Sequence, residues 1–228
     1  MLKPTHTTAI IIFANSSQKE SQHKAIVGGE KLFSYFNAQI LEKVQKTGLP
    51  YFIYSEKEQH GTTFGTRFSN AIADVFSKGF TQIITVGNDT PSLEAKDILK
   101  AQHDVQKNNV VFGPATDGGI YLLGIHKENF NAANFQNLPW QTQNLRVAFQ
   151  QSLDKENVHV QQLRTLKDID QQQDVIWFYK RLSQLSETFK NILLTIVQTV
   201  QSLCTQFVFY KNNFFTKLPY NKGSPLLH

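Results

Sequence analysis

The first candidate for chemistry in this 228-residue chain is Asp89, which follows the β-branched run of residues 83–86 and precedes Thr-Pro-Ser. This pattern predicts that Asp89 lies at the carboxyl end of a buried strand. In open α/β sheets, ligands bind in the crevice outside those strand ends. A carboxylate there could hold a divalent cation against a phosphate. Asp89 could instead cap the following helix, since Asp and Thr are common before a helix that starts with proline.

The second candidate is Asp117, the only acid in a loop between the apolar runs 110–112 and 120–125. Gly118 and Gly119 follow it and would let the backbone approach a ligand closely. Asp117 could hold an acceptor or act as its base, which requires hydrogen-bond reach of the attacking hydroxyl. Asp is also the ordinary residue for a turn before two glycines.

Strand and helix patterns alternate along the first three quarters of the chain. Helical patterns cover residues 30–46 and 65–78, and a third follows Pro91. We expect strands at 8–14, 51–55, 83–86, 110–113 and 120–125. This alternation predicts a largely parallel sheet covered by helices on both faces. From Val175 onward a long apolar stripe at helical spacing predicts either a helical hairpin packed on the domain or a dimerisation element.

Composition excludes several classes of protein. The chain is 40% hydrophobic, enough for one good core with a small appendage. Cys204 is the sole cysteine, which excludes an internal disulfide and a four-cysteine zinc site and is compatible with the cytosol. Polar residues interrupt the apolar stretch 191–209, so we expect no membrane span, and no signal peptide is expected. The net charge of +5 comes from scattered Lys and Arg, which favours a solvated surface over a nucleic-acid groove.

The chain carries a series of motifs: Phe64-Gly65-Thr66-Arg67-Phe68, Gly87-Asn88-Asp89-Thr90-Pro91, Gly113 to Gly124, Leu138-Pro139-Trp140-Gln141-Thr142, and Asp168-Ile169-Asp170 with Asp174. Their order resembles that seen in a bacterial family of unknown function. That family resembles the glycosyltransferase-A superfamily, and some of its members are labelled as nucleotide-diphospho-sugar transferases or as glycosyltransferases linked to arsenosugar synthesis. The resemblance covers roughly residues 8–175 and implies a three-layer, Rossmann-like α/β glycosyltransferase-A domain at 1–175. The helical pattern after it predicts a helical extension at 176–228.

The resemblance also implies roles for single residues. Asp89 would hold Mg²⁺ or Mn²⁺ against the donor diphosphate, and Asp170, preferred narrowly over Asp168, would complete the metal site. Asn88 stands where many such enzymes carry a second acid, and is a possible neutral ligand. Asp117 would position or deprotonate the acceptor. Further substrate contacts are expected from Lys24 and Arg67 (phosphate), Gly118 and Gly119, and Trp140 and Thr142, which could form an apolar lid anchor or an acceptor-stacking surface.

The donor loop departs from the family pattern. Members commonly carry an Arg- and Gly-rich stretch after the first strand, whereas residues 14–24 of this chain contain no Arg and no Gly. The leading hypothesis is a metal-dependent, cytoplasmic transferase that binds a nucleotide-sugar and a small acceptor, with a homodimer through the C-terminal helices as a further possibility. A nucleotidyltransferase on the same fold is the second hypothesis. The third is a non-catalytic binding module with a decayed nucleotide loop.

Overall fold

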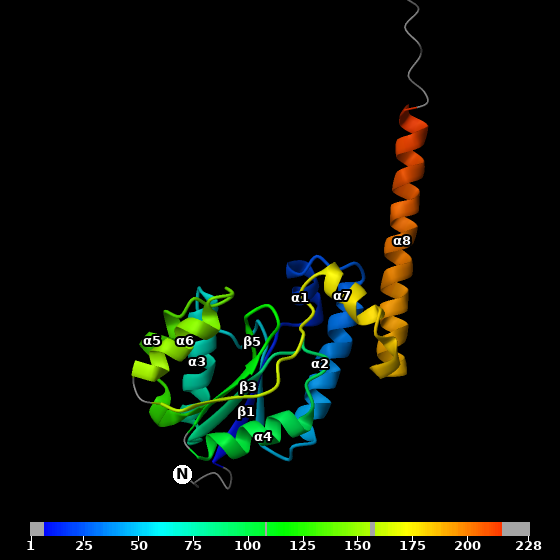
Figure 1. Cartoon of the computed structure of the whole chain (residues 1–228). Helices are drawn as coiled ribbons and strands as arrows, with labels where there is room; N and C mark the ends of the chain where they lie inside the picture. The colour runs from blue at the N-terminus through cyan, green and yellow to red at the C-terminus, as the bar shows by residue number, and fades with distance from the viewer. Residues whose placement is uncertain (1–6, 108, 156–157, 216–228) are drawn as a thin grey trace, which may run out of the picture. The chain divides into compact units, whose positions relative to one another are not determined.

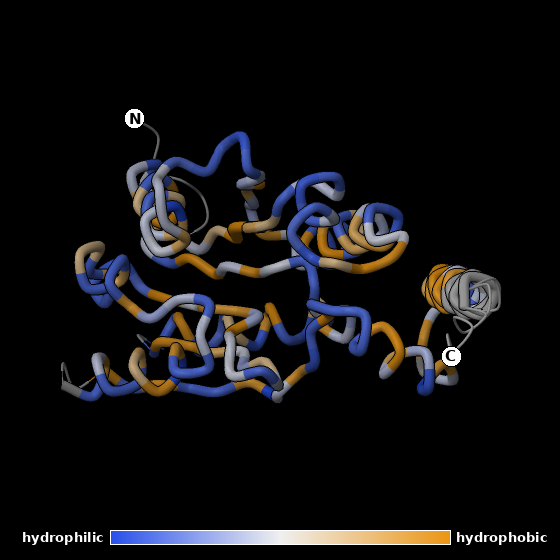
Figure 2. Tube along the Cα trace, turned by 90° about the horizontal axis from the view of Figure 1, so that it is seen from above, coloured by the Kyte–Doolittle hydropathy of each residue, from blue (hydrophilic) through white to orange (hydrophobic). Residues whose placement is uncertain are grey.

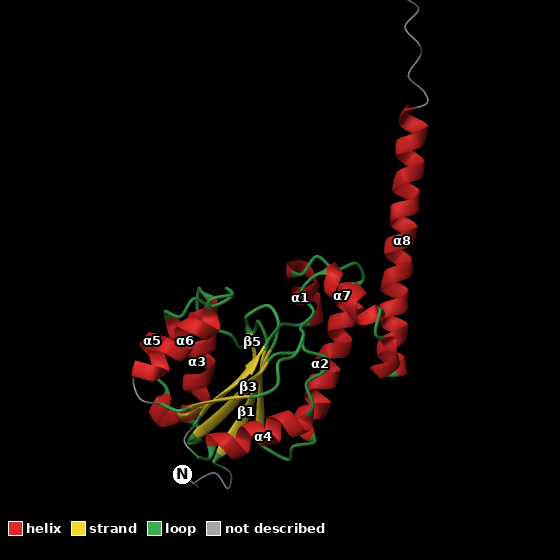
Figure 3. Cartoon of the chain, in the orientation of Figure 1, coloured by secondary structure: helices red, strands yellow, loops and turns green. Residues whose placement is uncertain are grey.

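The computed structural model describes residues 7–107, 109–155 and 158–215. The chain divides into two compact units, Met1–Val175 and Ile176–His228. The first unit contains a mixed α/β arrangement, in which the strands lie between helices (Figure 3).

The centre of the first unit is a six-stranded sheet with the order β2-β1-β3-β5-β4-β6. Figure 1 labels strands β1, β3 and β5 of this sheet. Strand β5 is antiparallel to both of its neighbours, β3 and β4, and the other pairs are parallel. The carboxyl ends of β3 and β4 therefore open at the same edge of the sheet. The strands are β1 (Thr8–Phe13), β2 (Tyr51–Tyr54), β3 (Gln82–Val86), β4 (Val110–Pro114), β5 (Ile120–His126) and β6 (Val160–Gln162).

Helices cover both faces of the sheet, which confirms the predicted three-layer α/β fold. Helices α3 (Phe64–Ser77), α5 (Ala132–Gln136) and α6 (Leu145–Lys155) pack on one face. Helices α2 (Gly29–Gln45) and α4 (Ala95–Val105) pack on the other. The short elements are α1 (Ser17–His23) and the 3-10 turn η1 (Lys127–Asn129).

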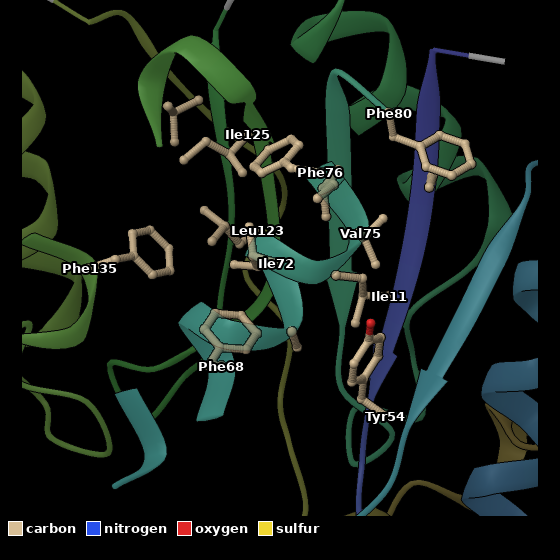
Figure 4. Packing of buried hydrophobic residues seen from close by; sticks show 14 of the residues in the cluster. Ile11, Tyr54, Phe68, Ile72, Val75, Phe76, Phe80, Leu123, Ile125 and Phe135 are labelled. Atoms are coloured by element: carbon tan, nitrogen blue, oxygen red, sulfur yellow. The ribbon is translucent and has the colours of Figure 1, made fainter. Parts of the chain in front are cut away.

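The core on the α3 face shows why this sequence forms these layers. Phe68, Ile72 and Val75 lie at helical spacing on α3 and point at the sheet, where they meet Ile11 and Leu123 (Figure 4). Hydrophobic residues recur along the strands and helices, between hydrophilic loops, in the hydropathy colouring of Figure 2. Burial of such a stripe is the main source of stability for an amphipathic helix.

Helix α4 begins later than the sequence predicted, and its first residue decides whether Asp89 could cap it. Its first residue is Ala95 and its N-cap is Glu94, whose backbone N–H donates to the Asp97 carboxylate at 2.9 Å. The interpretation of Asp89 as the helix cap is therefore wrong, because Asp89 lies five residues ahead of the cap position (94 − 89 = 5).

An ion pair ties α4 to the segment after β6. Arg164 donates from Nε and Nη2 to the two carboxylate oxygens of Asp97, at 3.0 and 2.8 Å. Burial acts to raise the pKa of Asp97, but the bonds from Arg164 and from the Glu94 N–H outweigh it, so the net pKa is lowered. Asp97 therefore contributes stability that is complete above its unfolded pKa of about 3.9 and is lost as the pH falls through the lower folded value.

We expect the Asp97→Asn variant to be less stable than the wild type by about 1–2 kcal/mol near neutral pH, as for the loss of a charge-assisted hydrogen bond. The gap should narrow as the pH drops below about 3.9, because the wild-type carboxyl is protonated first in the unfolded chain and, at lower pH, in the folded protein. Urea unfolding of both proteins across this range measures the gap. A difference in stability that stayed constant down to the lowest pH would show that the ionised Asp97 carboxylate is not its source.

The second unit is built on helices. Helix α7 (Gln172–Tyr179) crosses the unit boundary and is followed by the 3-10 turn η2 (Leu182–Gln184) and the long helix α8 (Glu187–Phe215). Phe189, Ile192, Leu193 and Ile196 of α8 are buried. The predicted apolar stripe is thus divided among three elements, and its predicted end at Pro219 and Gly223 lies outside the described residues. Within the residues that the structure describes, none of the helices combines the length and apolar character needed to cross a membrane.

Candidate functional site

A cavity of about 670 Å³ opens at the carboxyl edge of the sheet. Loops from distant parts of the chain line it: the segment after β1, the turn after β3, the β4–β5 loop, residues 140–143 and the segment at 168–170. Nearly all the residues predicted to bind or react line this cavity: Lys24, Arg67, Asn88, Asp89, Asp117, Gly119, Trp140, Thr142 and Asp170.

Three carboxylates meet in this cavity. Oxygens of Asp117, Asp168 and Asp170 lie within 4.8 Å of one another. The backbone brings them together, because Thr116 N–H donates to Leu166 O at 3.0 Å and Ile169 N–H donates to Asp89 O at 2.9 Å. The structure thus joins Asp168 to the predicted Asp117 and Asp170. The sequence narrowly favours Asp170 over Asp168; in the structure both belong to this group, and Asp170 also contacts Lys24 Nζ at 2.7 Å.

The electrostatics of this group favour a bound cation. The pKa of Asp168 is raised to about 7, first by burial and then by the neighbouring charges of Asp170, Asp117 and Asp89. Burial also raises the pKa of Asp170; Lys24 opposes this shift while Asp89 and Asp117 add to it. Carboxylates that share a site resist joint ionisation, and a divalent ion would remove that cost. Their hard oxygen donors suit Mg²⁺ or Mn²⁺.

Asp117 is held in a tight turn. Its Oδ1 accepts a hydrogen bond from the Gly119 N–H at 2.7 Å, while its side chain remains exposed to the cavity. Gly118 has φ of +96°, and a Cβ there would lie 2.9 Å from the Gln143 carbonyl oxygen. The structure therefore explains Gly118 by backbone conformation and close packing against residue 143, rather than by a ligand.

Asp89, the first predicted metal ligand, lies against a lysine. Lys24 Nζ is 2.8 Å from Asp89 Oδ2 and 2.7 Å from Asp170 Oδ1, and Glu20 Oε1 is 3.1 Å away. Within the described residues, Asp89 is not part of the group of three acids that could share one ion. Glu20 lies on α1 and Lys24 is the C-cap residue of that helix, so the two are spaced i, i+4, a signal that could have linked Glu20 to the site from the sequence.

The remaining predicted residues lie in different parts of the cavity wall. Arg67 Nε donates to Gln59 Oε1 at 3.2 Å. Asn88 is buried, and its side-chain NH₂ donates to Asn37 Oδ1 of α2 at 2.7 Å, so only its own Oδ1 is left as a neutral ligand atom. Thr142 Oγ1 donates to the Pro139 carbonyl at 2.7 Å.

Trp140 serves the hydrophobic core as well as the cavity wall. Its Nε1 donates to the Phe135 carbonyl at 2.6 Å, and its ring lies 5.1 Å from the Phe68 ring and 5.6 Å from the Phe64 ring. These contacts favour the apolar lid anchor over free acceptor stacking, because the indole N–H and one face are already engaged.

The donor loop that departs from the family pattern is held by a carboxylate from the segment after β2. The backbone N–H and hydroxyl of Ser16 both donate to the Glu56 carboxylate, at 2.7 and 2.6 Å. These bonds lower the pKa of Glu56, the hydroxyl bond first. The sequence reasoning missed Glu56, since nothing local relates positions 16 and 56.

Part of the chain matches the model of a known protein family. Residues 42–142 match the model of a family described as "Uncharacterized protein conserved in bacteria (DUF2064)". This match confirms the predicted resemblance to a bacterial family of unknown function. No curated protein matches the chain.

Solved structures share the fold. The chain is similar to a protein from Desulfovibrio desulfuricans G20 that is provisionally assigned as a nucleotide-diphospho-sugar transferase. The TM-score is 0.74 at 20% identity, over 89% of this chain and 99% of that chain. A second match is 4-diphosphocytidyl-2C-methyl-D-erythritol synthase from Anaerococcus prevotii DSM 20548, with a TM-score of 0.50 at 12% identity, over 78% of this chain and 96% of that chain. The predicted Rossmann-like fold is thereby confirmed.

Proposed function

We propose that the protein is a metal-dependent transferase that binds a nucleotide diphosphate-sugar and transfers the glycosyl group to a small acceptor. The observation that carries this proposal is the charge of the cavity. Its described lining includes five carboxylates, Glu20, Asp89, Asp117, Asp168 and Asp170, but two full cations, Lys24 and Arg67. A diphosphate would be repelled from such a wall unless a divalent ion entered with it.

Three of these acidic residues take part directly in the proposed reaction. Asp168 and Asp170 would hold the ion, which would neutralise charge developing on the leaving diphosphate. Asp117, fixed by the Gly119 N–H and close to both, would orient the acceptor hydroxyl and take its proton. Arg67, which also lines the cavity, would contact phosphate oxygens, and Trp140 would close the acceptor end of the cavity.

A nucleotidyltransferase is the second candidate, supported by the shared fold of the diphosphocytidyl synthase. The two reactions would use the same acids. A nucleotidyltransferase would break a phosphate bond of the nucleotide, whereas a glycosyltransferase would break the glycosidic bond of the nucleotide-sugar. A non-catalytic binding module is the third, and the Ser16–Glu56 bonds support it because they occupy donors of the loop where a phosphate would be expected.

The proposal extends to the organisation of the chain. Residues 1–175 would form the transferase domain and 176–228 a helical extension, matching the two compact units. The exposed Leu203 on α8 is consistent with pairing of that helix with a second copy. We place the protein in the cytoplasm, in keeping with its single cysteine.

Thermal unfolding tests the function directly. We expect one nucleotide-sugar from a panel of UDP, GDP, CDP and dTDP sugars to raise the unfolding temperature in the presence of Mn²⁺ or Mg²⁺, and not in its absence. At about 100 times the dissociation constant the ligand should stabilise the fold by about 2.7 kcal/mol. A shift with nucleoside triphosphates alone would favour the nucleotidyltransferase, and no shift with any member would favour the binding module.

Asp117→Asn separates binding from transfer in the same assay. We expect this variant to keep the Mn²⁺-dependent shift and to lose transfer of the sugar by about 10²–10⁴-fold, the usual contribution of a general base. Transfer at the wild-type rate would remove Asp117 from the chemistry.

A further inference from the structure

The Lys24 ammonium is surrounded by oxygens. Its Nζ lies 2.7 Å from Asp170, 2.8 Å from Asp89 and 3.1 Å from Glu20, and it is also 3.3 Å from the Ile169 carbonyl oxygen. A lysine ammonium has three N–H donors and no acceptor. The protein itself therefore saturates Lys24, and this resting arrangement leaves no donor for a phosphate.

Three separate segments build this enclosure. Glu20 lies on α1, Asp89 follows β3, and Asp170 lies between β6 and α7, so the arrangement depends on the tertiary fold. The Lys24 side chain is 14% exposed, and its Nζ lies 5.4 Å from the centre of the Phe33 ring. Burial acts to lower the pKa of Lys24, but Asp89, Asp170 and Glu20 outweigh it and raise the pKa well above its usual range. The ammonium is thus a fixed positive charge.

The same position was predicted for a metal ion. Asp89 and Asp170 are the two acids assigned to Mg²⁺ or Mn²⁺ from the sequence, and the structure places an ammonium between them. Asp170 has a second set of neighbours, since one of its oxygens also lies within 4.8 Å of Asp117 and Asp168 oxygens. Asp170 therefore stands between two cation positions, one already filled by Lys24.

We propose that Lys24 is a built-in cation of this site, whose ammonium fills the position between Asp89 and Asp170. The chain therefore uses one divalent ion, beside Asp168, where the acids alone would bind two. This inference rests on the proposed function for the role of the remaining ion. It revises the predicted roles of two residues, because Lys24 neutralises carboxylates rather than phosphate, and Asp89 holds Lys24 rather than a metal.

The Lys24 ammonium and a divalent ion would compete for the same carboxylates. Without Lys24, Glu20, Asp89 and Asp170 would be left partly buried with no counter-charge, which is costly. A divalent ion supplies two positive charges and accepts carboxylate oxygens directly. Loss of the ammonium should therefore open a second position for a divalent ion.

Mn²⁺ binding to the full-length protein, followed by titration calorimetry and by electron paramagnetic resonance of free Mn²⁺, tests this inference. We expect Lys24→Met to bind one Mn²⁺ more than the wild type, or to bind Mn²⁺ at least tenfold more tightly. The matched control is Lys19→Met, which removes one exposed lysine from α1, the helix that Lys24 follows, and should behave as the wild type. Unchanged or weaker Mn²⁺ binding by Lys24→Met would overturn the proposal.

A second variant covers the case in which Lys24→Met does not fold without metal. In Lys24→Met/Asp89→Asn one carboxylate is neutralised with the lysine, so this protein should fold, and it should gain no Mn²⁺ site. If Lys24→Met is unstable, Mn²⁺ should restore its thermal unfolding temperature, and failure to restore it would count against the inference.

The outcomes also separate this inference from the proposed function. A gain of Mn²⁺ by Lys24→Met without any nucleotide-dependent shift in the wild type would support the built-in cation and contradict the transferase. If the wild type showed a metal-dependent rise in unfolding temperature with a nucleotide, and Lys24→Met gained no Mn²⁺ binding, the transferase would be supported and the built-in cation contradicted.

Discussion

The Asp168→Asn variant should unfold at a higher temperature than the wild type when metal is absent, and should bind Mn²⁺ about 100-fold more weakly. Both effects have one cause. The Asp168 carboxylate is half-buried and is repelled by Asp170, Asp117 and Asp89, so its ionised form is costly until a cation arrives. A 100-fold loss of affinity corresponds to about 2.7 kcal/mol, a reasonable share for one charged ligand.

The two effects are measured by thermal unfolding in a chelator at about pH 8 and by Mn²⁺ titration. Each kcal/mol gained should raise the midpoint by about 2–4 °C for a protein of this size. Asp154→Asn is the matched control, since it removes an exposed carboxylate on α6 and should change neither result. If Asp168→Asn lowered the midpoint and kept its Mn²⁺ affinity, Asp168 would be a structural residue and the metal assignment would fail.

The Gly65→Ala variant should lose about 1–3 kcal/mol of stability, the usual effect of overpacking a filled interior. Gly65 lies in the first turn of α3, and a Cβ there would lie 2.5 Å from the Gln136 carbonyl oxygen and 2.6 Å from Trp140 Cδ1. Such distances require the backbone of α5 or the indole of Trp140 to move. Because Trp140 lines the cavity, nucleotide binding should weaken together with stability.

Urea unfolding measures the loss of stability, and tryptophan fluorescence reports the displacement of the indole. Gly29→Ala is the matched control in the first turn of α2. Its Cβ would meet the edge of the Phe33 ring at 3.3 Å, a contact that a small side-chain movement relieves. Alanine also has the higher helix propensity, so this control should be neutral or slightly stabilising. Equal changes in stability in the two variants would show that Gly65 is not packed more tightly than Gly29.

The helices and strands were largely determined by local sequence. Helical periodicity predicted 30–46 and 65–78, and the structure has Gly29–Gln45 and Phe64–Ser77. Each pattern places a buried stripe every three or four residues, and burial of that stripe selects the helix regardless of what it packs against. The rule that ligands bind at strand ends also placed Asp89 and Asp117 at one edge of the sheet.

The fine structure of the site was decided by tertiary contacts. No local pattern relates Lys24 to Asp89 or Asp170, or Ser16 to Glu56, because these partners come from segments far apart in the chain. The antiparallel insertion of β5 between β3 and β4 likewise depends on sheet pairing. A sequence shows which residues carry charge and which faces are apolar, so it determined the layers and the acids at the sheet edge. Which acid meets which cation depends on ångström-scale distances between separate loops, and only the folded chain sets those.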